Sequence, residues 1–168
     1  MNSLKHFCSR SLTEVKNSTL GIILALALIG FADATYLTLE HFRGVIPPCS
    51  AVFGCEKVLT SSYSIIAGIP VSLLGMIYYA IVSIGIFLYL EKKINTKMTS
   101  VSDGVRLRLT LLFTTFGLLF SVWFIFTQAF ILHAYCLYCL GSAVTSIIIF
   151  CLAIGVLKKH SIPSISNI

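Results

Sequence analysis

The feature that most constrains this chain is a run of 49 residues, Leu109 to Leu157, that contains no Asp, Glu, Lys or Arg. A soluble domain carries charge at roughly a quarter of its positions, so a run of this length does not suit a surface in water. A helix that crosses a bilayer needs about 20 predominantly apolar residues. The run therefore predicts two membrane-spanning helices, at about 109–131 and 137–157, joined by a very short turn near His133 to Tyr135.

Two further stretches have the same character. A first span is expected at about 18–40, where Asp33 is the one charge before the end of the stretch. The stretch Val58 to Leu90 has no charge, but its first third is rich in Ser, Gly and Pro, so we expect the second helix at about 70–90, with a proline in its first turn. The predicted fold class is an all-α integral membrane protein, a bundle of four transmembrane helices with an outer loop at about 41–69 that carries a cysteine pair.

Composition excludes other classes of protein. With 57% apolar and 11% charged residues the chain is not disordered, and six cysteines in 168 residues are too sparse for a disulfide-rich mini-protein. The basic start and Ala25-Leu26-Ala27 are also features of cleaved signal peptides. The apolar stretch is long for such a peptide, and its removal would leave an odd number of helices. We therefore expect it to be retained, within a single membrane domain over residues 1–168.

The basic residues are distributed unevenly between the two sides of such a bundle. Ten of the 12 lysines and arginines fall on one side, which leaves only Arg43 and Lys57 on the other. Positively charged loops stay in the cytoplasm, so we expect both termini to be cytoplasmic and the outer loop to face the opposite compartment. The net charge of +6 is then a topology signal, and we expect no nucleic-acid partner because no aromatic residues are interleaved with the basic ones.

Four of the six cysteines share the outer side. Cys49 and Cys55 lie in the outer loop, and Cys136 and Cys139 form a Cys-x-x-Cys at the start of the last span. A cysteine at a helix start meets unpaired backbone N–H groups and the positive end of the helix dipole, which stabilise its thiolate. The second cysteine of the motif lies one turn further in, where an oxidant dissolved in the bilayer can reach it. Two pairs at two depths indicate a relay by thiol–disulfide exchange.

Two other interpretations of these cysteines stay open at this point. Two structural disulfides could tie the loop to the helix, or the four sulfurs could bind a zinc ion. The five-residue gap between Cys49 and Cys55 is wide for a zinc site, which usually has two closely spaced pairs, and we expect no metal.

The residues around the cysteines resemble the bacterial homologues of vitamin K epoxide reductase, over roughly Gly21 to Gly155. The segments that carry the resemblance are Tyr36-Leu37-Thr38-Leu39-Glu40-His41, Cys49-Ser50-Ala51-Val52-Phe53-Gly54-Cys55, Val58-Leu59-Thr60-Ser61-Ser62-Tyr63, Gly68-Ile69-Pro70 with Gly75 and Tyr78, and Cys136-Leu137-Tyr138-Cys139-Leu140.

The resemblance implies an enzyme, a quinone-dependent thiol-disulfide oxidoreductase of the bacterial inner membrane. Bacterial members of that family reoxidise a periplasmic thioredoxin-fold protein of the DsbA type and reduce a membrane quinone, either ubiquinone or menaquinone. Carried over by position, Cys49 exchanges with the partner protein, Cys55 exchanges with Cys136, and Cys139 faces the quinone. Ser61 matches a serine near the active site and is assigned a supporting hydrogen-bonding role.

Two departures from the family pattern refine this expectation. Many bacterial members carry a thioredoxin-like domain after the last helix, whereas only Lys158 to Ile168 follows it here, so we expect the partner to be a separate chain. The animal enzymes have a tyrosine one turn after the second cysteine, where this chain has Ala143. Simple quinone reduction is thus favoured over reduction of vitamin K epoxide. Two alternative functions remain. The chain is a vitamin K or quinone epoxide reductase, or it is a non-enzymatic membrane subunit with structural disulfides or zinc.

Two further residues are candidates for contact with the quinone. Asp33 is an acid inside a span, which is unfavourable unless it faces the bundle or water, and it is a candidate proton donor to the reduced quinone. Phe116 belongs to an aromatic stripe on the third span, and a flat ring suits a quinone wall, although such a stripe is also typical of packing or lipid contact. His133 precedes the Cys-x-x-Cys and is either a thiolate-stabilising group or an interfacial histidine with no role.

Overall fold

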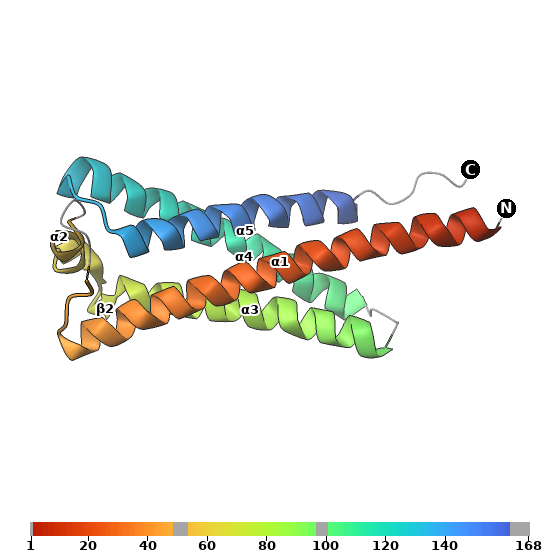
Figure 1. The fold of residues 1–168 in the computed structure, drawn as a ribbon, viewed down its shortest axis with the longest axis horizontal. Helices are drawn as coiled ribbons and strands as arrows, with labels where there is room; N and C mark the ends of the chain where they lie inside the picture. Colours follow the sequence, from red (N-terminus) through yellow and green to blue (C-terminus); the bar gives the residue numbers. More distant parts are fainter. Residues whose placement is uncertain (1, 49–53, 97–100, 162–168) are drawn as a thin grey trace.

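The computed structural model describes the backbone of residues 2–48, 54–96 and 101–161, and the side chains of 18–48, 54–91 and 105–157. The described residues form four long helices, and these run along the long axis of a bundle (Figure 1). Their bounds are Asn2–Arg43 (α1), Val71–Thr96 (α3), Val101–Phe126 (α4) and Leu137–Ser161 (α5).

Four segments of the described helices are long and apolar enough to cross a membrane, which confirms the predicted fold class of a four-helix membrane bundle. They are Ser18–Arg43, Val71–Glu91, Val105–Leu132 and Leu137–Leu157. The third segment begins at Val105 rather than near 109, and the first continues to Arg43 rather than ending near 40. Arginine tolerates these positions because its aliphatic stem lies along the apolar helix while its charged head reaches water.

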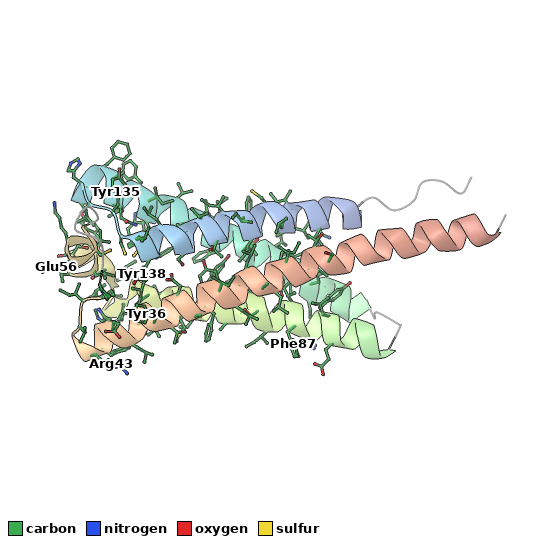
Figure 2. All side chains as sticks on the ribbon, viewed as in Figure 1. Tyr36, Arg43, Glu56, Phe87, Tyr135 and Tyr138 are labelled. Atoms are coloured by element: carbon green, nitrogen blue, oxygen red, sulfur yellow. The ribbon has the colours of Figure 1, made fainter. Side chains whose placement is uncertain are left out.

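The outside of the bundle is apolar. Phe87 on α3 points away from the bundle (Figure 2) and is 53% exposed. Exposed leucine, isoleucine, valine and phenylalanine side chains occur on all four long helices, and a surface of this kind suits lipid. Inside the bundle, α1 packs against α3 and α5, and α4 packs against the same two helices.

The short elements between α1 and α3 gather at one end of the bundle, whereas the start of α1 and the end of α5 lie at the other (Figure 1). These elements are the helix Cys55–Leu59 (α2), the 3₁₀ turn Ser62–Ser64 (η1), and the strands Ile65–Ile66 (β1) and Ile69–Pro70 (β2). The strands pair antiparallel, with Ile65 opposite Pro70. Ala67 and Gly68 between them both have positive φ, 52° and 82°, the backbone of a tight two-residue hairpin turn.

The segment predicted as an outer loop is therefore folded over much of its length. Cys55 is the first residue of α2, and Cys49, the other half of the predicted pair, lies outside the described residues. Helix α3 begins at Val71, directly after the hairpin, so the proline predicted in its first turn belongs instead to β2.

Helix α4 ends in a π-helical segment, Thr127–Leu132 (η2). His133 follows in the left-handed conformation, with φ 47° and ψ 41°, and the chain enters α5 four residues later. The tight reversal lies where the sequence predicts a very short connection, and it sets the position of Cys136.

Candidate active site

Cys136 is the residue before the first turn of α5, and its sulfur caps that helix. The backbone N–H of Cys139 donates to Cys136 Sγ at 3.4 Å, and the N–H of Leu140 donates to the Cys136 carbonyl at 2.9 Å. The hydrogen bond with the Cys139 side chain holds the pKa of the Cys136 thiol below its ordinary value, and backbone N–H groups of the first turn act in the same direction. Burial opposes this shift, since Cys136 is 0% exposed. Cys136 thus has the thiolate-stabilising environment that a cysteine at a helix start predicts.

Cys55 lies in the same buried apolar cluster as Cys136 and Cys139. The other members of this cluster are Leu37, Val58, Phe124, Leu132 and Ala134. Cys55 is 1% exposed and disulfide-bonded, whereas Cys136 and Cys139 are free thiols. Residues 44–70, which join α1 to α3, form the outer segment. A disulfide-bonded cysteine of this outer segment and a pair of free thiols at the start of α5 therefore share one buried apolar region.

Gly54 makes the close approach between the outer segment and α5 possible. A Cβ at this position would lie 2.8 Å from the Cβ of Ala134, which is shorter than real Cβ contacts. The absence of a side chain at Gly54 lets the start of α2 lie directly against the turn before Cys136.

Tyr138, between the two cysteines of the motif, contacts the outer segment as well. Its ring lies 5.6 Å from that of Tyr36 on α1, and Figure 2 shows both residues toward the end of the bundle that carries α2. The Tyr138 hydroxyl donates to the Pro48 carbonyl at 3.4 Å, so the start of α5 is bound to the chain that follows α1.

A cavity of about 570 Å³ opens between the four long helices below the outer segment. Most of its lining is apolar, and Cys139 reaches it from α5 whereas Cys136 does not line it. Cavities of this size with a few polar groups are typical of sites for small organic molecules. The Cys-x-x-Cys pair therefore belongs to the cluster that holds Cys55, and Cys139 connects this cluster to the cavity.

Polar side chains line the inner half of the cavity. The Tyr79 hydroxyl donates to the Ser142 carbonyl at 2.6 Å, and the Ser146 hydroxyl donates to the Tyr78 hydroxyl at 3.2 Å. Asp33 also lines the cavity, and one of its carboxylate oxygens, Oδ2, is buried with no hydrogen-bond partner among the described residues. The cavity wall thus contains hydroxyl groups and one carboxylate, an oxygen of which has no partner among the described residues.

Of the residues predicted to contact a quinone, Cys139, Asp33 and Phe116 line the cavity. Phe116 is 66% exposed, so it stands at the rim, where the cavity meets the lipid-facing surface. Ser61 is not among the lining residues, because its hydroxyl points back and donates to the Val58 carbonyl at 2.7 Å. Its hydrogen bond shapes the end of α2, and Ser64 lines the cavity in its place.

Sequence reasoning missed Gln128, which lies in η2 and is 0% exposed. Its side-chain Oε1 accepts a hydrogen bond from the backbone N–H of Cys136 at 2.8 Å. A signal was present, because this residue is the one glutamine in the sequence and stands inside the uncharged run, eight positions before Cys136. His133, in contrast, is exposed on the turn.

No group of three or more His, Cys, Asp or Glu side chains within 18–48, 54–91 and 105–157 is arranged to hold a metal ion. The zinc alternative therefore finds no support in that part of the chain.

Comparison with known proteins identifies one family. The family model described as the Vitamin K epoxide reductase family matches residues 21–154, a range that contains Cys55, Cys136 and Cys139. No curated protein matches the sequence. The resemblance predicted from the cysteine segments is confirmed at the level of the family.

Proposed function

This chain belongs to the vitamin K epoxide reductase family, and on that premise we propose that it is a quinone-dependent thiol-disulfide oxidoreductase of the membrane. It reoxidises a separate periplasmic DsbA-like protein of the thioredoxin fold. Two electrons then pass through two cysteine pairs to ubiquinone or menaquinone.

One observation carries this proposal: the Cys-x-x-Cys pair joins the cluster that holds Cys55 to the cavity. Both Cys136 and Cys139 lie in the cluster with Cys55, and Cys139 also lines the cavity. A pair in this position can take electrons from the outer disulfide and present them to an acceptor inside the membrane. Two purely structural disulfides would require neither a cysteine in the cavity wall nor a cluster shared by Cys55 and the Cys-x-x-Cys pair.

The cavity fits a quinone in size and in chemistry. Its volume of about 570 Å³ and its apolar walls suit a flat ring with a prenyl tail, and Phe116 at the rim offers a route toward lipid. A bound quinone supplies the two-electron, two-proton acceptor of the reaction. Asp33 has an unpartnered carboxylate oxygen in the wall, so we assign it the role of holding a proton for transfer into the cavity.

The thiol steps follow from the positions of the cysteines. A thiolate of the partner attacks the outer disulfide at Cys49, which breaks the bond to Cys55 and releases the Cys55 thiolate. This thiolate attacks Cys136 in the Cys136–Cys139 disulfide, so that Cys55–Cys136 forms and Cys139 leaves as a thiolate. The partner's second thiolate then attacks the partner's own sulfur in the mixed disulfide, which oxidises the partner and releases the Cys49 thiolate. Cys49 attacks Cys55 in the Cys55–Cys136 disulfide and re-forms the outer pair, and the lowered pKa of Cys136 makes it a good leaving group in this step.

The orientation proposed for the membrane rests on the distribution of basic residues. Ten of the 12 lysines and arginines fall on one side of the bundle, and we place that side in the cytoplasm. Both termini are then cytoplasmic, and the end of the bundle that carries Cys55 and Cys136 faces the periplasm of a bacterium. Disulfides persist in that compartment, as the outer pair requires.

The proposal is tested by steady-state quinone reduction with purified protein in detergent. A reduced thioredoxin-fold protein or a small dithiol serves as the donor, and loss of quinone absorbance is followed. Cys139→Ala should abolish the activity with both donors, whereas Cys49→Ala should abolish it only with the protein donor. Cys151→Ala is the matched control, since this free cysteine is exposed and lies outside the site. Normal quinone reduction by Cys139→Ala would overturn the proposal.

The alternative function, reduction of vitamin K epoxide, is tested by offering the epoxide and the quinone as acceptors in parallel assays. Ala143 lines the cavity at the position where the animal enzymes have a tyrosine, so α5 supplies no phenol at that position. The phenols of the cavity wall, Tyr78 and Tyr79, come from α3 and are hydrogen-bonded to Ser146 and Ser142. We expect quinone reduction without epoxide reduction. Equal rates with both acceptors would assign the chain to the epoxide reductases instead.

A further inference from the structure

Gln128 organises the turn between α4 and α5 through three backbone groups. Its carbonyl oxygen is the acceptor for the N–H of His133 and for that of Ala134, the second at 3.2 Å. Its side-chain Oε1 accepts the N–H of Cys136 at 2.8 Å. One residue of η2 therefore holds the whole reversal that delivers the first cysteine of the motif.

The contact to Cys136 is unusual because it reaches the cysteine from another helix. The N–H of a residue before a helix has no partner inside that helix, and here it is buried where water does not satisfy it. The Gln128 amide satisfies it and fixes the Cys136 backbone to η2, eight residues away. The position of the Cys136 sulfur is thus set from α4 as well as from α5.

The other end of the Gln128 amide is unsatisfied. Nε2 is buried and has no hydrogen-bond partner among the described residues, although the side chain is 0% exposed. Helix α2, which begins with Cys55, packs against η2. The Gln128 amide thus has N–H groups with no acceptor among the described residues, on a segment that packs against the helix of Cys55. Segments of π-helix are frequent at functional sites, and a buried polar group without a partner is uncommon.

We propose that Gln128 is a positioning residue for the exchange between Cys55 and Cys136. It holds the Cys136 backbone so that the sulfur stays at the start of α5 and faces the cluster that contains Cys55. The inference rests on the proposed function, since it concerns the step between the two cysteine pairs. In that step one S–S bond forms as another breaks, and the departing sulfur leaves as a thiolate.

The exchange can be isolated from quinone and partner in a Cys139→Ala background. There the Cys136 thiolate attacks the disulfide-bonded Cys55, the Cys55–Cys136 bond forms, and the former partner of Cys55 leaves as a thiolate. Cys139 is absent and cannot resolve the mixed disulfide, and the acid quench stops the reverse attack by the released thiolate. Its yield is measured by acid quench, alkylation and mass spectrometry under non-reducing conditions.

Three variants are compared in this background. Gln128→Met keeps the length of the side chain but removes the acceptor, and we expect the rate of formation of the mixed disulfide to fall at least about tenfold. Gln128→Glu retains an acceptor oxygen for the Cys136 N–H and should keep most of the rate. Ser83→Ala is the matched control, because Ser83 is also buried, lacks a partner among the described residues and lies outside the cavity.

A second readout separates positioning from a general structural role. With Cys49 and Cys55 both replaced by Ala, a small dithiol reduces Cys136–Cys139 directly and drives quinone reduction without the exchange. Gln128→Met should change this bypass activity less than about twofold. Equal losses in exchange and bypass, or an exchange rate equal to that of Ser83→Ala, would overturn the proposal. Absence of any quinone reduction by the parent protein would instead contradict the proposed function, and the exchange assay would still report on Gln128.

Discussion

The contact between Gly54 and Ala134 allows a test of how closely the outer segment must approach the start of α5. In Gly54→Ala the new methyl carbon would lie 2.8 Å from Ala134 Cβ, whereas ordinary carbon contacts are about 3.5–4.0 Å. The backbone at Gly54 has φ −79°, which alanine adopts without strain, so the effect is steric. Relief of the overlap requires α2 and the turn to separate by roughly 1 Å.

Cys55 is the next residue, so this displacement moves its sulfur relative to Cys136. A misplacement of about 1 Å between reacting groups costs on the order of 10²-fold in rate, equivalent to about 2.7 kcal/mol. We expect Gly54→Ala to slow formation of the Cys55–Cys136 disulfide by this factor, measured by quench and mass spectrometry in a Cys139→Ala background.

A second substitution at the contact between residues 54 and 134 should restore the exchange rate. Ala134→Gly removes the facing methyl group, and the nearest remaining atom to a Cβ at position 54 is then the backbone Cα of residue 134, at an ordinary distance of 3.7 Å. The double variant Gly54→Ala with Ala134→Gly should recover most of the exchange rate. Gly141→Ala is the control, because a Cβ there meets no atom within 4 Å. An unchanged rate in Gly54→Ala, or no recovery in the double variant, would refute the reasoning.

Three further predictions concern the site. Reduced Cys136 has a lowered pKa, so its thiolate persists to lower pH than that of an ordinary cysteine. Its alkylation by iodoacetamide should reach half the maximal rate below about pH 8.5, and a midpoint at or above that pH would contradict the thiolate-stabilising environment of the helix start. Asp33→Asn removes the proton carrier and should slow quinone reduction by about 10²-fold while formation of Cys55–Cys136 is unchanged; an unaffected turnover would exclude the role in proton transfer. Tyr79→Phe removes the hydroxyl that donates to Ser142 and should lower the free energy of unfolding by about 1 kcal/mol in a denaturant titration; equal stability would show that the bond contributes nothing.

The long helices were predictable because the bilayer leaves few alternatives. An uncharged run from Leu109 to Leu157 can only cross the membrane twice, and the turn near His133 follows from the length of two spans. The placement of Cys136 before the first turn of α5 was predictable for the same reason, since the motif opens the last run.

The short elements of the outer segment were not predictable from composition. The stretch is rich in Ser, Gly and Pro, which reads as loop, yet Ala67 and Gly68 both take positive φ and close a hairpin. Alanine gives no sign of such a conformation in a sequence. Ser61 was expected at the site from resemblance alone, and the direction of its hydroxyl depends on the end of α2.

Gln128 escaped prediction because of the π-helical segment. A sequence pattern read with α-helical periodicity assigns a residue to a helix face, and the change of winding in Thr127–Leu132 alters that assignment. The hydrogen bond of Tyr79 could not be predicted either, because its partner Ser142 is 63 residues away on another helix. Side-chain pairing across a bundle follows from packing, and packing is not visible in the order of the residues.

The claim at the centre of the proposed function is that Cys136 and Cys139 deliver electrons from the outer disulfide to an acceptor in the cavity. A single turnover tests it most directly: fully reduced protein is mixed without oxygen or donor with one equivalent of a short-chain ubiquinone, and the remaining thiols are alkylated and mapped by mass spectrometry. Disulfide formation should appear at Cys136–Cys139 first, at the rate at which quinone is consumed, and at the outer pair later. Consumption of quinone with both Cys136 and Cys139 still alkylated would contradict this claim.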